Sequence, residues 1–444
     1  MQLICLSVSH HNTPVELREC INLAPQVIEN AFINSPVRTA PFEAILELAI
    51  VSTCNRLEIY GLVSLAAAVE ENPLSVIQPV KAYLRDALDI PIPQVDSYFR
   101  QYMGGQAVRH LFQVASGLDS IAIGETQVLG QVSRALDTAL QFGSARHVLS
   151  SVFRAAIHTG KRVRTETEIG RHPTNISKIG VQLAESKMGR LVDRNILVIG
   201  AGKMGEYTID ALQSSGVQQI VLTNRTLNHA IEMAEQMGGR VLAYEHLFDG
   251  LVEADLVFTS TAAPVPIIHR DLILQVMQRR KGRSMTIVDL AVPRNTEARV
   301  KDIPNVDVVD MDDLQTFAKS AVVSSHQEIA RAQDIVEEEV TAYEKLLRII
   351  PFIGELHRKV EDIRQREVEK ALRRLSNPTP EVSEQMEQLS RSLVRKVLHE
   401  PTMHLRTETN QETLTDYVDL LAKLFDLSEN VPDFLKKDNR WEHP

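Results

Sequence analysis

The chain has 444 residues, too many for one ordinary hydrophobic core and enough for two or three domains of typical size. Apolar residues make up 44% of it and charged residues 24%, a balance that excludes a disordered chain. The net charge of −10 argues against a general nucleic-acid-binding protein, although a local basic patch is compatible with it. No apolar run approaches the roughly 20 residues that a bilayer requires, and we expect no targeting leader before the first strand-like segment.

The cysteines are few and unpaired in sequence. The three of them form no C-x-x-C motif, so we expect a reducing, cytoplasmic environment. Cys5 lies inside an apolar strand-like run and Cys20 falls on an apolar helical face, so we expect both to be small core residues. Cys54 follows an apolar run in a polar loop, two residues before Arg56, a cation that favours thiolate. On the residues alone, Cys54 is either a nucleophile or an inert structural cysteine.

Composition and motifs divide the chain into three stretches. Residues 1–165 mix strand-like and helix-like segments, as an α+β domain does. Residues 166–314 alternate apolar strand-like runs with amphipathic helices, which is typical of a parallel α/β sheet. Residues 315–444 are helical by pattern, and their first helix has an apolar stripe that must be covered. The stripe comprises Ile329, Val336, Val340, Tyr343, Leu347 and Ile350.

Two helical segments of the first stretch carry polar groups in regular positions. Residues 107–115 predict an amphipathic helix, and His110 falls on the face opposite its apolar stripe. There, His110 is either a functional group or an ordinary surface histidine. Gln127, Gln131 and Arg134 align on one face of a later helix. That face either recognises a polar substrate or is simply solvated.

A basic stripe closes the first stretch. Its residues share one helical face, except for the last, which follows closely behind. They are Arg154, His158, Lys161, Arg162 and Arg164. The stripe either binds nucleic-acid phosphates with a salt-sensitive affinity, or is a basic helix that faces solvent or acidic residues of another domain.

The middle stretch carries a glycine motif in its proper context. Residues 196–199 predict a buried strand, and Gly200-Ala201-Gly202-Lys203-Met204-Gly205 follows directly and leads into a helix. This is G-x-G-x-x-G between strand and helix. The glycines permit a tight turn and close approach to a pyrophosphate, and the unpaired N–H groups of the helix face the phosphates.

The end of the next strand indicates which dinucleotide binds. Asn224-Arg225-Thr226 stands where an NAD-binding domain usually places Asp or Glu for the ribose hydroxyl. Arg225 favours a 2'-phosphate, so we prefer NADPH to NADH, the alternative being an ordinary loop arginine. Strand-like runs at 256–259 and 286–290 complete a doubly wound pattern.

Four spaced motifs resemble, in order, those of the glutamyl-tRNA reductase family. They are Ser52-Thr53-Cys54-Asn55-Arg56, the stretch from His110 to Gln131, Gly200 to Gly205, and Asn224-Arg225-Thr226. The similarity covers essentially the whole chain. It implies NADPH-dependent reduction of glutamyl-tRNA(Glu) to glutamate-1-semialdehyde with release of the tRNA, through a cysteine thioester. This is the first step of the five-carbon route to 5-aminolevulinate and tetrapyrroles.

The resemblance also implies an architecture and a set of site residues. It implies an N-terminal catalytic domain, a Rossmann-like NADPH-binding domain and a helical dimerisation domain joined by a long spinal helix, in a V-shaped homodimer. It makes Cys54 the nucleophile and His110 important for activity, with no metal. The implied glutamyl site comprises Thr53, Asn55, Arg56, Ser120, Glu125, Thr126, Gln127 and Gln131. The implied NADPH site comprises Gly200, Ala201, Gly202, Lys203, Met204, Gly205, Asn224, Arg225 and Thr226. A transient complex with glutamate-1-semialdehyde aminomutase is implied as well.

The implied chemistry leaves some roles open. A thioester accepts hydride more readily than an oxygen ester, which explains a cysteine nucleophile beside a nicotinamide. Arg56 either stabilises the thiolate or pairs with the γ-carboxylate of the substrate, and we favour the second role. One assignment for His110 is protonation of the leaving oxygen. The alternative functions are a shikimate-dehydrogenase-like NADP oxidoreductase and a non-catalytic, NADPH-binding dimeric regulator.

Overall fold

The computed structural model describes residues 1–11, 13–53, 55–64, 76–170, 175–321, 326–375, 379–407 and 411–427. The chain forms two compact units, Met1–Glu337 and Glu338–Pro444. Cys54 and the side chain of Thr126 lie outside the described part of the structure, so their predicted roles stay predictions.

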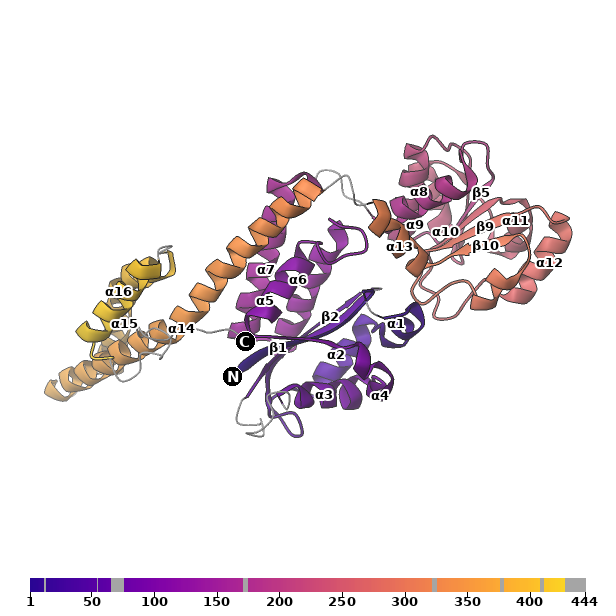
Figure 1. The fold of residues 1–444 in the computed structure, drawn as a ribbon. Helices are drawn as coiled ribbons and strands as arrows, with labels where there is room; N and C mark the ends of the chain where they lie inside the picture. Colours follow the sequence, from indigo (N-terminus) through magenta and orange to yellow (C-terminus); the bar gives the residue numbers. More distant parts are fainter. Residues whose placement is uncertain are drawn as a thin grey trace. The chain divides into compact units, whose positions relative to one another are not determined.

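A four-stranded antiparallel sheet, in the order β2–β3–β1–β4, is the centre of the N-terminal region (Figure 1). The strands are β1 (Gln2–Ser9), β2 (Ile45–Thr53), β3 (Arg56–Val63) and β4 (Arg100–Met103). In the β2–β3 hairpin the last register pair is Thr53 with Arg56, and the backbone N–H of His10 donates to the carbonyl of Asn55 at 3.0 Å. The end of β1 is thereby tied to the hairpin tip.

Helices cover both faces of this sheet (Figure 1). The helices of this region are α1 (Val15–Ile21), α2 (Pro25–Asn34), α3 (Gln78–Leu88), α4 (Ile92–Val95), α5 (Gly105–Ala115), α6 (Thr126–Gln141) and α7 (His147–Glu166), with short 3-10 turns at Asp96–Tyr98 and Glu168–Gly170. Leu57 and Ile59 of β3 pack with Phe32 and Tyr83 in one apolar core on the α2–α3 side. Because side chains alternate along a strand, Glu58 faces the opposite side, toward α5 and α7.

The middle region is a doubly wound parallel sheet, as the sequence predicts. Its strand order is β7–β6–β5–β8–β9–β10, so the order reverses between β5 and β8. The strands are β5 (Ile196–Ile199), β6 (Ile220–Thr223), β7 (Arg240–Val241), β8 (Leu256–Thr259), β9 (Met285–Asp289) and β10 (Val306–Val309). All four strand-like runs singled out in the sequence form neighbouring strands of this sheet.

Each face of the parallel sheet has its own apolar core. Val198 packs with residues of α8 and α9, and its neighbour Leu197 packs with residues of α11 and α12, which explains the continuous apolar run of β5. The helices are α8 (Ile176–Met188), α9 (Lys203–Ser214), α10 (Leu227–Met237), α11 (Leu247–Glu253), α12 (Arg270–Arg280) and α13 (Met311–Ala321), with 3-10 turns at Tyr244–His246 and Ala298–Asp302.

The C-terminal region is helical, as expected. It contains α14 (His326–Arg374), which starts in the first unit and continues into the second, α15 (Pro380–Thr407) and α16 (Gln411–Leu424). Of the predicted stripe on α14, Val336, Val340 and Tyr343 are buried and Ile329 is half-buried. The side chains of Leu347 and Ile350 lie outside the described part. Among the described helices, none combines the length and apolar character needed to cross a membrane.

Candidate active site

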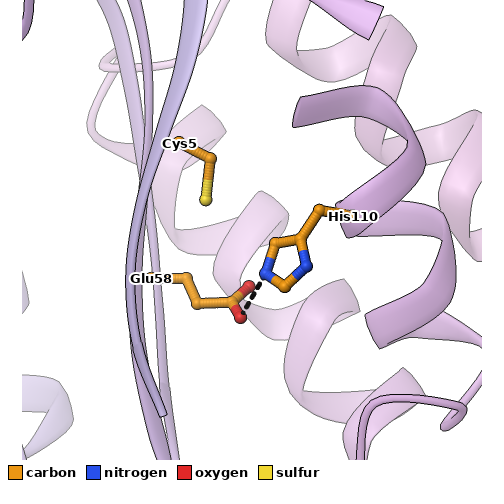
Figure 2. A group of neighbouring side chains, drawn as sticks. All are labelled: Cys5, Glu58 and His110. Atoms are coloured by element: carbon orange, nitrogen blue, oxygen red, sulfur yellow. Dashed lines mark hydrogen bonds and ion pairs between the residues drawn. The ribbon is translucent and has the colours of Figure 1, made fainter. Parts of the chain in front are cut away.

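A buried polar network lies between the antiparallel sheet and α5, with Glu58 at its centre. The Glu58 side chain is fully buried, and Oε1 accepts hydrogen bonds from His110 Nε2 at 2.8 Å, Arg56 Nη1 at 2.8 Å and Ser7 Oγ at 3.2 Å. Its other oxygen, Oε2, accepts from the Tyr60 hydroxyl at 2.7 Å. Figure 2 shows Glu58 on the strand facing His110 on the helix. A carboxylate buried this deeply is stable only because its lone pairs are satisfied.

Charge pairing keeps this network ionised. Burial alone raises the pKa of the Glu58 carboxyl, but His110 and Arg56 outweigh it and lower that pKa to about 2. Burial opposes the charge of Arg56 as well, yet Glu58 and Asp119 together hold the pKa of its guanidinium above the ordinary value. Both charges are therefore fixed across the physiological pH range.

Asp119 extends the network toward the protein surface. It accepts from Arg56 Nη1 at 2.8 Å through Oδ2 and contacts His11 Nε2 at 2.9 Å through Oδ1. Burial raises the pKa of Asp119, but the bond from His11 and the charge of Arg56 hold it well below the usual range. The backbone carbonyl of Asp119 accepts from Arg56 Nη2.

Arg56 retains donors for a ligand. A guanidinium has five N–H groups, and the bonds to Glu58 and Asp119 use two on Nη1 and one on Nη2. The Nε–H and the second Nη2–H have no partner among the described residues. Arg56 is 3% exposed and lines a small pocket. It can thus hold the network together and still donate to an anion in that pocket.

His110 is not on a surface, so of its two alternatives the ordinary surface histidine is wrong. It is 4% exposed and stacks on Tyr102 with ring centroids 4.1 Å apart. The reason is that α5 packs against α6 and α7 and also against β1 and β4 of the sheet. Amphipathic periodicity predicts one buried face and cannot reveal that a sheet covers the second.

Cys5, Glu58 and His110 have the residue types of a metal site, and their ligand atoms all lie within 4.8 Å of one another (Figure 2). Both Glu58 oxygens and His110 Nε2 are already used in hydrogen bonds. Burial, followed by the charge of Glu58, raises the pKa of the Cys5 thiol well above its usual value, which opposes the thiolate that a metal requires. We therefore assign these side chains to the hydrogen-bonded network and no metal to them.

Most predicted glutamyl-site residues converge on the small pocket at the hairpin tip. Its lining residues are His10, Thr53, Asn55, Arg56, Ser120, Ile121, Glu125, Val128 and Gln131. Gln127 instead lines the neighbouring pocket at the glycine motif, which also includes Asn55 and Glu125. Burial raises the pKa of Glu125, with Arg56 opposing. The clustering is geometric, and the role of each residue stays a prediction.

The pocket at the glycine motif lies where the sheet order reverses. It is bounded by residues that follow β5, β8 and β9, the carboxyl edge at which such sheets bind ligands. Its lining residues are Asn55, Glu125, Gln127, Ile176, Gly200, Ala201, Gly202, Lys203, Met204, Asn224, His229, Ser260, Thr261, Ala262, Leu290, Ala291, Val292 and Met311. Ser260 Oγ is buried here without a partner among the described residues, so a donor or acceptor is available to a ligand.

The three motif glycines differ in how much space a Cβ atom would find at each of them. Gly200 has φ +117° and a Cβ there would lie 2.8 Å from the Ser260 carbonyl oxygen, whereas a Cβ on Gly205 would collide with the carbonyl of Gly200. A Cβ on Gly202 would meet nothing within 4 Å. Gly200 and Gly205 are therefore required by the fold, and Gly202 leaves open space at the start of α9 for a phosphate.

The three residues after β6 do not all reach this pocket. Asn224 lines it, and its Oδ1 accepts from the backbone N–H of Ala201 at 3.4 Å. Arg225 and Thr226 are exposed and are not among the lining residues. No acidic residue follows β6 at this position, so the site is compatible with a 2'-phosphate on the ribose.

Arg18 and Arg294 connect the N-terminal region to the cofactor-binding region. Arg18, 2% exposed, donates from Nη1 to Asn55 Oδ1 at 2.8 Å and from Nη2 to Asp312 Oδ1. Arg294, just after β9, donates from Nε to Glu19 Oε1 at 2.9 Å. These contacts explain how two pockets come to share lining residues.

One other sequence expectation changes, and the basic stripe keeps both of its alternatives. Cys20 is exposed, so its assignment to the core is wrong: α1 has only seven residues and buries another face. In the basic stripe, Arg154, His158 and Lys161 are exposed, but Arg162 Nε donates to Glu166 Oε1 at 2.7 Å.

Several residues of the site were not predicted, although one of them, Asp119, lies within the stretch from His110 to Gln131. Glu58, Asp119, His10 and Arg18 received no role from the sequence. For Glu58 a signal existed, because a carboxylate between apolar residues of a strand must be satisfied by partners. The contacts of Asp119, His10 and Arg18 are seen only in the folded structure.

A doubly wound dinucleotide-type fold beside an α+β domain with a buried polar pocket defines a multidomain, cofactor-dependent oxidoreductase. Residues 6–167 match the model of the glutamyl-tRNAGlu reductase N-terminal domain, and residues 331–427 match that of its dimerisation domain. Residues 182–317 match the shikimate / quinate 5-dehydrogenase model. The chain belongs to the glutamyl-tRNA reductase family.

Known relatives cover the chain almost end to end. The glutamyl-tRNA reductase of Geobacter sulfurreducens is 36% identical over 438 residues, 98% of each chain. That of Pelotomaculum thermopropionicum is 34% identical over 430 residues, 96% of this chain and 94% of the relative. The solved glutamyl-tRNA reductase from Methanopyrus kandleri is 29% identical, covers 96% of this chain and 99% of its own, and has a TM-score of 0.44.

Proposed function

We propose that this chain reduces the glutamyl group of glutamyl-tRNA(Glu) to glutamate-1-semialdehyde with NADPH and releases the tRNA, the first step toward 5-aminolevulinate and tetrapyrroles. The observation that carries the proposal is that the hairpin-tip pocket and the glycine-motif pocket share Asn55 and Glu125. A hydride donor and its acceptor must lie side by side, and two adjoining pockets provide that arrangement. The shikimate-dehydrogenase-like alternative loses support because residues 6–167 match a different catalytic domain.

The reaction is assigned to Cys54, between Thr53 and Asn55 in the chain. Its thiolate attacks the glutamyl carbonyl, the ester bond to the tRNA ribose breaks, the ribose oxygen takes a proton from water as it leaves, and a thioester forms. Bound NADPH supplies the hydride. The reduced adduct then collapses to the aldehyde and regenerates the thiolate.

The network beneath the pocket is assigned a positioning role. His110 Nε2 is already bonded to Glu58, so protonation of the leaving oxygen from that atom would break a buried hydrogen bond. We therefore assign His110 to holding Glu58, and Glu58 to holding Arg56. Arg56 keeps its favoured role, recognition of the substrate γ-carboxylate, through the two donors that the network does not use.

The cofactor assignment follows from the chain's own residues. The open position at Gly202 and the start of α9 suit a pyrophosphate, and the absence of an acidic residue after β6 suits NADPH. The family relationship supports the same cofactor. Arg225, exposed near the pocket edge, is proposed to pair with the 2'-phosphate.

The decisive experiment detects the thioester directly. The full chain is mixed rapidly with radiolabelled glutamyl-tRNA without NADPH, quenched in acid, and digested. We expect the label on the peptide that contains Cys54, and neither label nor aldehyde in Cys54→Ser. Aldehyde formation at full rate with no label on that peptide would contradict the mechanism.

The tRNA is proposed to contact the exposed part of the basic stripe, Arg154, His158 and Lys161 on α7. Replacing Arg154 and Lys161 by Glu should weaken tRNA binding and flatten its salt dependence by about one unit of slope per lost phosphate contact. Arg85→Glu is the control, since Arg85 is also exposed but pairs with its neighbour Asp86. An unchanged affinity and slope would place the tRNA elsewhere.

The C-terminal helices are proposed to form a homodimer. Leu389, Leu393 and Val397 recur every four residues on α15 and are 55–67% exposed, an apolar stripe that the described residues of the chain leave uncovered. The match to a dimerisation domain supports a second copy as the occupant. Leu393→Glu should yield monomers in light scattering, whereas an unchanged dimer would exclude this face.

The product is a reactive aldehyde, which supports a transient complex with glutamate-1-semialdehyde aminomutase that consumes it. We place both enzymes in the cytoplasm.

A further inference from the structure

An unused imidazole lines the pocket assigned to the glutamyl group. His10 follows β1 directly and is 5% exposed, and its Nδ1 is buried without a hydrogen-bond partner among the described residues. Ser120 Oγ, in the lining of the same pocket, is also buried without a partner there. Buried polar atoms normally have hydrogen-bond partners. Two such atoms without a partner in one pocket therefore indicate that a ligand group forms hydrogen bonds with them.

The charges around His10 indicate which ligand group this is. Burial, followed by His11 and Arg56, lowers the pKa of His10 to about 2, and only Asp119 among the named neighbours opposes them appreciably. The imidazole is therefore neutral, with one N–H and one lone pair. Arg56 lines the same pocket and supplies a positive charge that attracts an anion.

Three residues of this pocket can donate hydrogen bonds to one carboxylate. Neutral His10 can donate from Nδ1, the Ser120 hydroxyl can donate, and Arg56 has two N–H groups outside its internal network. All three residues line the same pocket. On the proposed function, the substrate group with two acceptor oxygens is the γ-carboxylate of the glutamyl residue.

We propose that His10 is a specificity-determining residue, which donates a hydrogen bond from Nδ1 to the γ-carboxylate of the glutamyl group alongside Ser120 and Arg56. The backbone bond from His10 to Asn55 holds the imidazole beside the hairpin tip. A γ-carboxamide presents one acceptor where the carboxylate presents two, so His10 favours glutamate over glutamine.

The test compares two substrates on the same tRNA, one loaded with glutamate and one with glutamine. The ratio of their kcat/KM values is measured for the wild type, His10→Leu and His10→Asn. We expect His10→Leu to lower the ratio about tenfold, mainly through slower use of the glutamyl substrate. His10→Asn retains an amide donor near Nδ1 and should recover part of the ratio, which a merely structural histidine would not produce.

His246→Gln is the control. His246 is an exposed histidine whose Nδ1 lies 3.8 Å from Asp249 Oδ2, and it lines neither of the two pockets. It should preserve the substrate ratio even if stability falls, and unfolding curves for each variant separate misfolding from lost recognition.

The outcomes are distinct. If His10→Leu keeps the wild-type ratio, the proposal is overturned, because His10 Nδ1 then does not contribute to the distinction between glutamate and glutamine. Loss of discrimination between glutamyl and 2-hydroxyglutaryl groups, with the glutamate-to-glutamine ratio intact, also overturns it by placing His10 at the α-amino end. If the wild type forms no aldehyde from glutamyl-tRNA, the proposed function fails, and this inference fails with it.

Discussion

The two pockets are built in opposite ways. The glycine-motif pocket lies at the carboxyl edge of a parallel sheet and includes the turn in which Gly200, Gly202 and Gly205 lie within six consecutive residues. The hairpin-tip pocket rests on a network of side chains from β1, β3, α5 and the loop at Asp119. The glycine turn is local in sequence and relies on the absence of side chains at its glycines. The network of side chains is non-local and relies on buried charges that compensate one another.

This contrast predicts which kind of substitution disrupts each site. A backbone site fails when a side chain is added, because there is no space or the ligand is displaced. A buried charged network fails when a single partner is removed, because the remaining charges stay buried without compensation. The following changes test that difference.

The largest effect is expected for Glu58→Gln. The change leaves Arg56 with one carboxylate in place of two and should cost about 3–5 kcal/mol of unfolding free energy and most activity. The control is Glu47→Gln on the neighbouring strand, whose carboxylate accepts backbone N–H groups of Arg146, Val148 and Leu149 away from the pocket. Denaturant unfolding and steady-state rates check both variants. Equal activity losses would show that the network has no special link to the site.

The pH dependence of stability should differ between the sites. Burial raises the pKa of Asp289 at the end of β9 to about 6, against hydrogen bonds from Ala291, Thr259 and Thr296. The native state therefore holds the proton on Asp289 more tightly than the unfolded state does. The contribution of Asp289 to the free energy of unfolding falls as pH rises from about 4 to 6, by roughly 1–3 kcal/mol. Glu58 has the opposite sign, because its pKa is lowered from the ordinary value to about 2, so its contribution to stability is complete above the ordinary carboxyl pKa and is lost as pH falls below it.

Unfolding of the wild type and Asp289→Asn at several pH values isolates this contribution. The stability difference, wild type minus variant, should shrink as pH rises through that window. A difference that is constant with pH would show that Asp289 does not titrate there.

The motif glycines provide a matched pair. Gly205→Ala places a methyl group against the carbonyl of Gly200 and should cost about 1–3 kcal/mol of stability. Gly202→Ala meets nothing in the protein, so the fold should keep its melting temperature while NADPH affinity falls about tenfold. Thermal unfolding and NADPH fluorescence titration distinguish them. Equal losses of stability would refute the assignment of Gly202 to the ligand.

The smallest effect concerns cofactor choice. Arg225→Gln removes the cation proposed to face the 2'-phosphate, so the preference for NADPH over NADH should fall about tenfold, near 1.4 kcal/mol. The kcat/KM values for both cofactors measure it, with exposed Arg240 replaced by Gln as control. An unchanged preference would assign the phosphate to other groups.

The sequence by itself determined the parts that depend on local order. Hydrophobic periodicity within short segments predicted the strands of the parallel sheet and the helical C-terminal region. The conformational freedom of glycine predicted the turn at the glycine motif. The resemblance predicted a set of glutamyl-site residues, most of which line one pocket, and Thr53, Asn55 and Arg56 among them are close in sequence to the expected nucleophile.

Only the tertiary structure decided what those side chains meet. It buried His110 under a sheet that the helical pattern could not reveal, exposed Cys20, and engaged Arg56 with Glu58 and Asp119. It also brought His10 into the pocket. The physical reason is that burial and charge pairing depend on residues distant in the chain, whose approach is set by how strands and helices pack rather than by any local pattern.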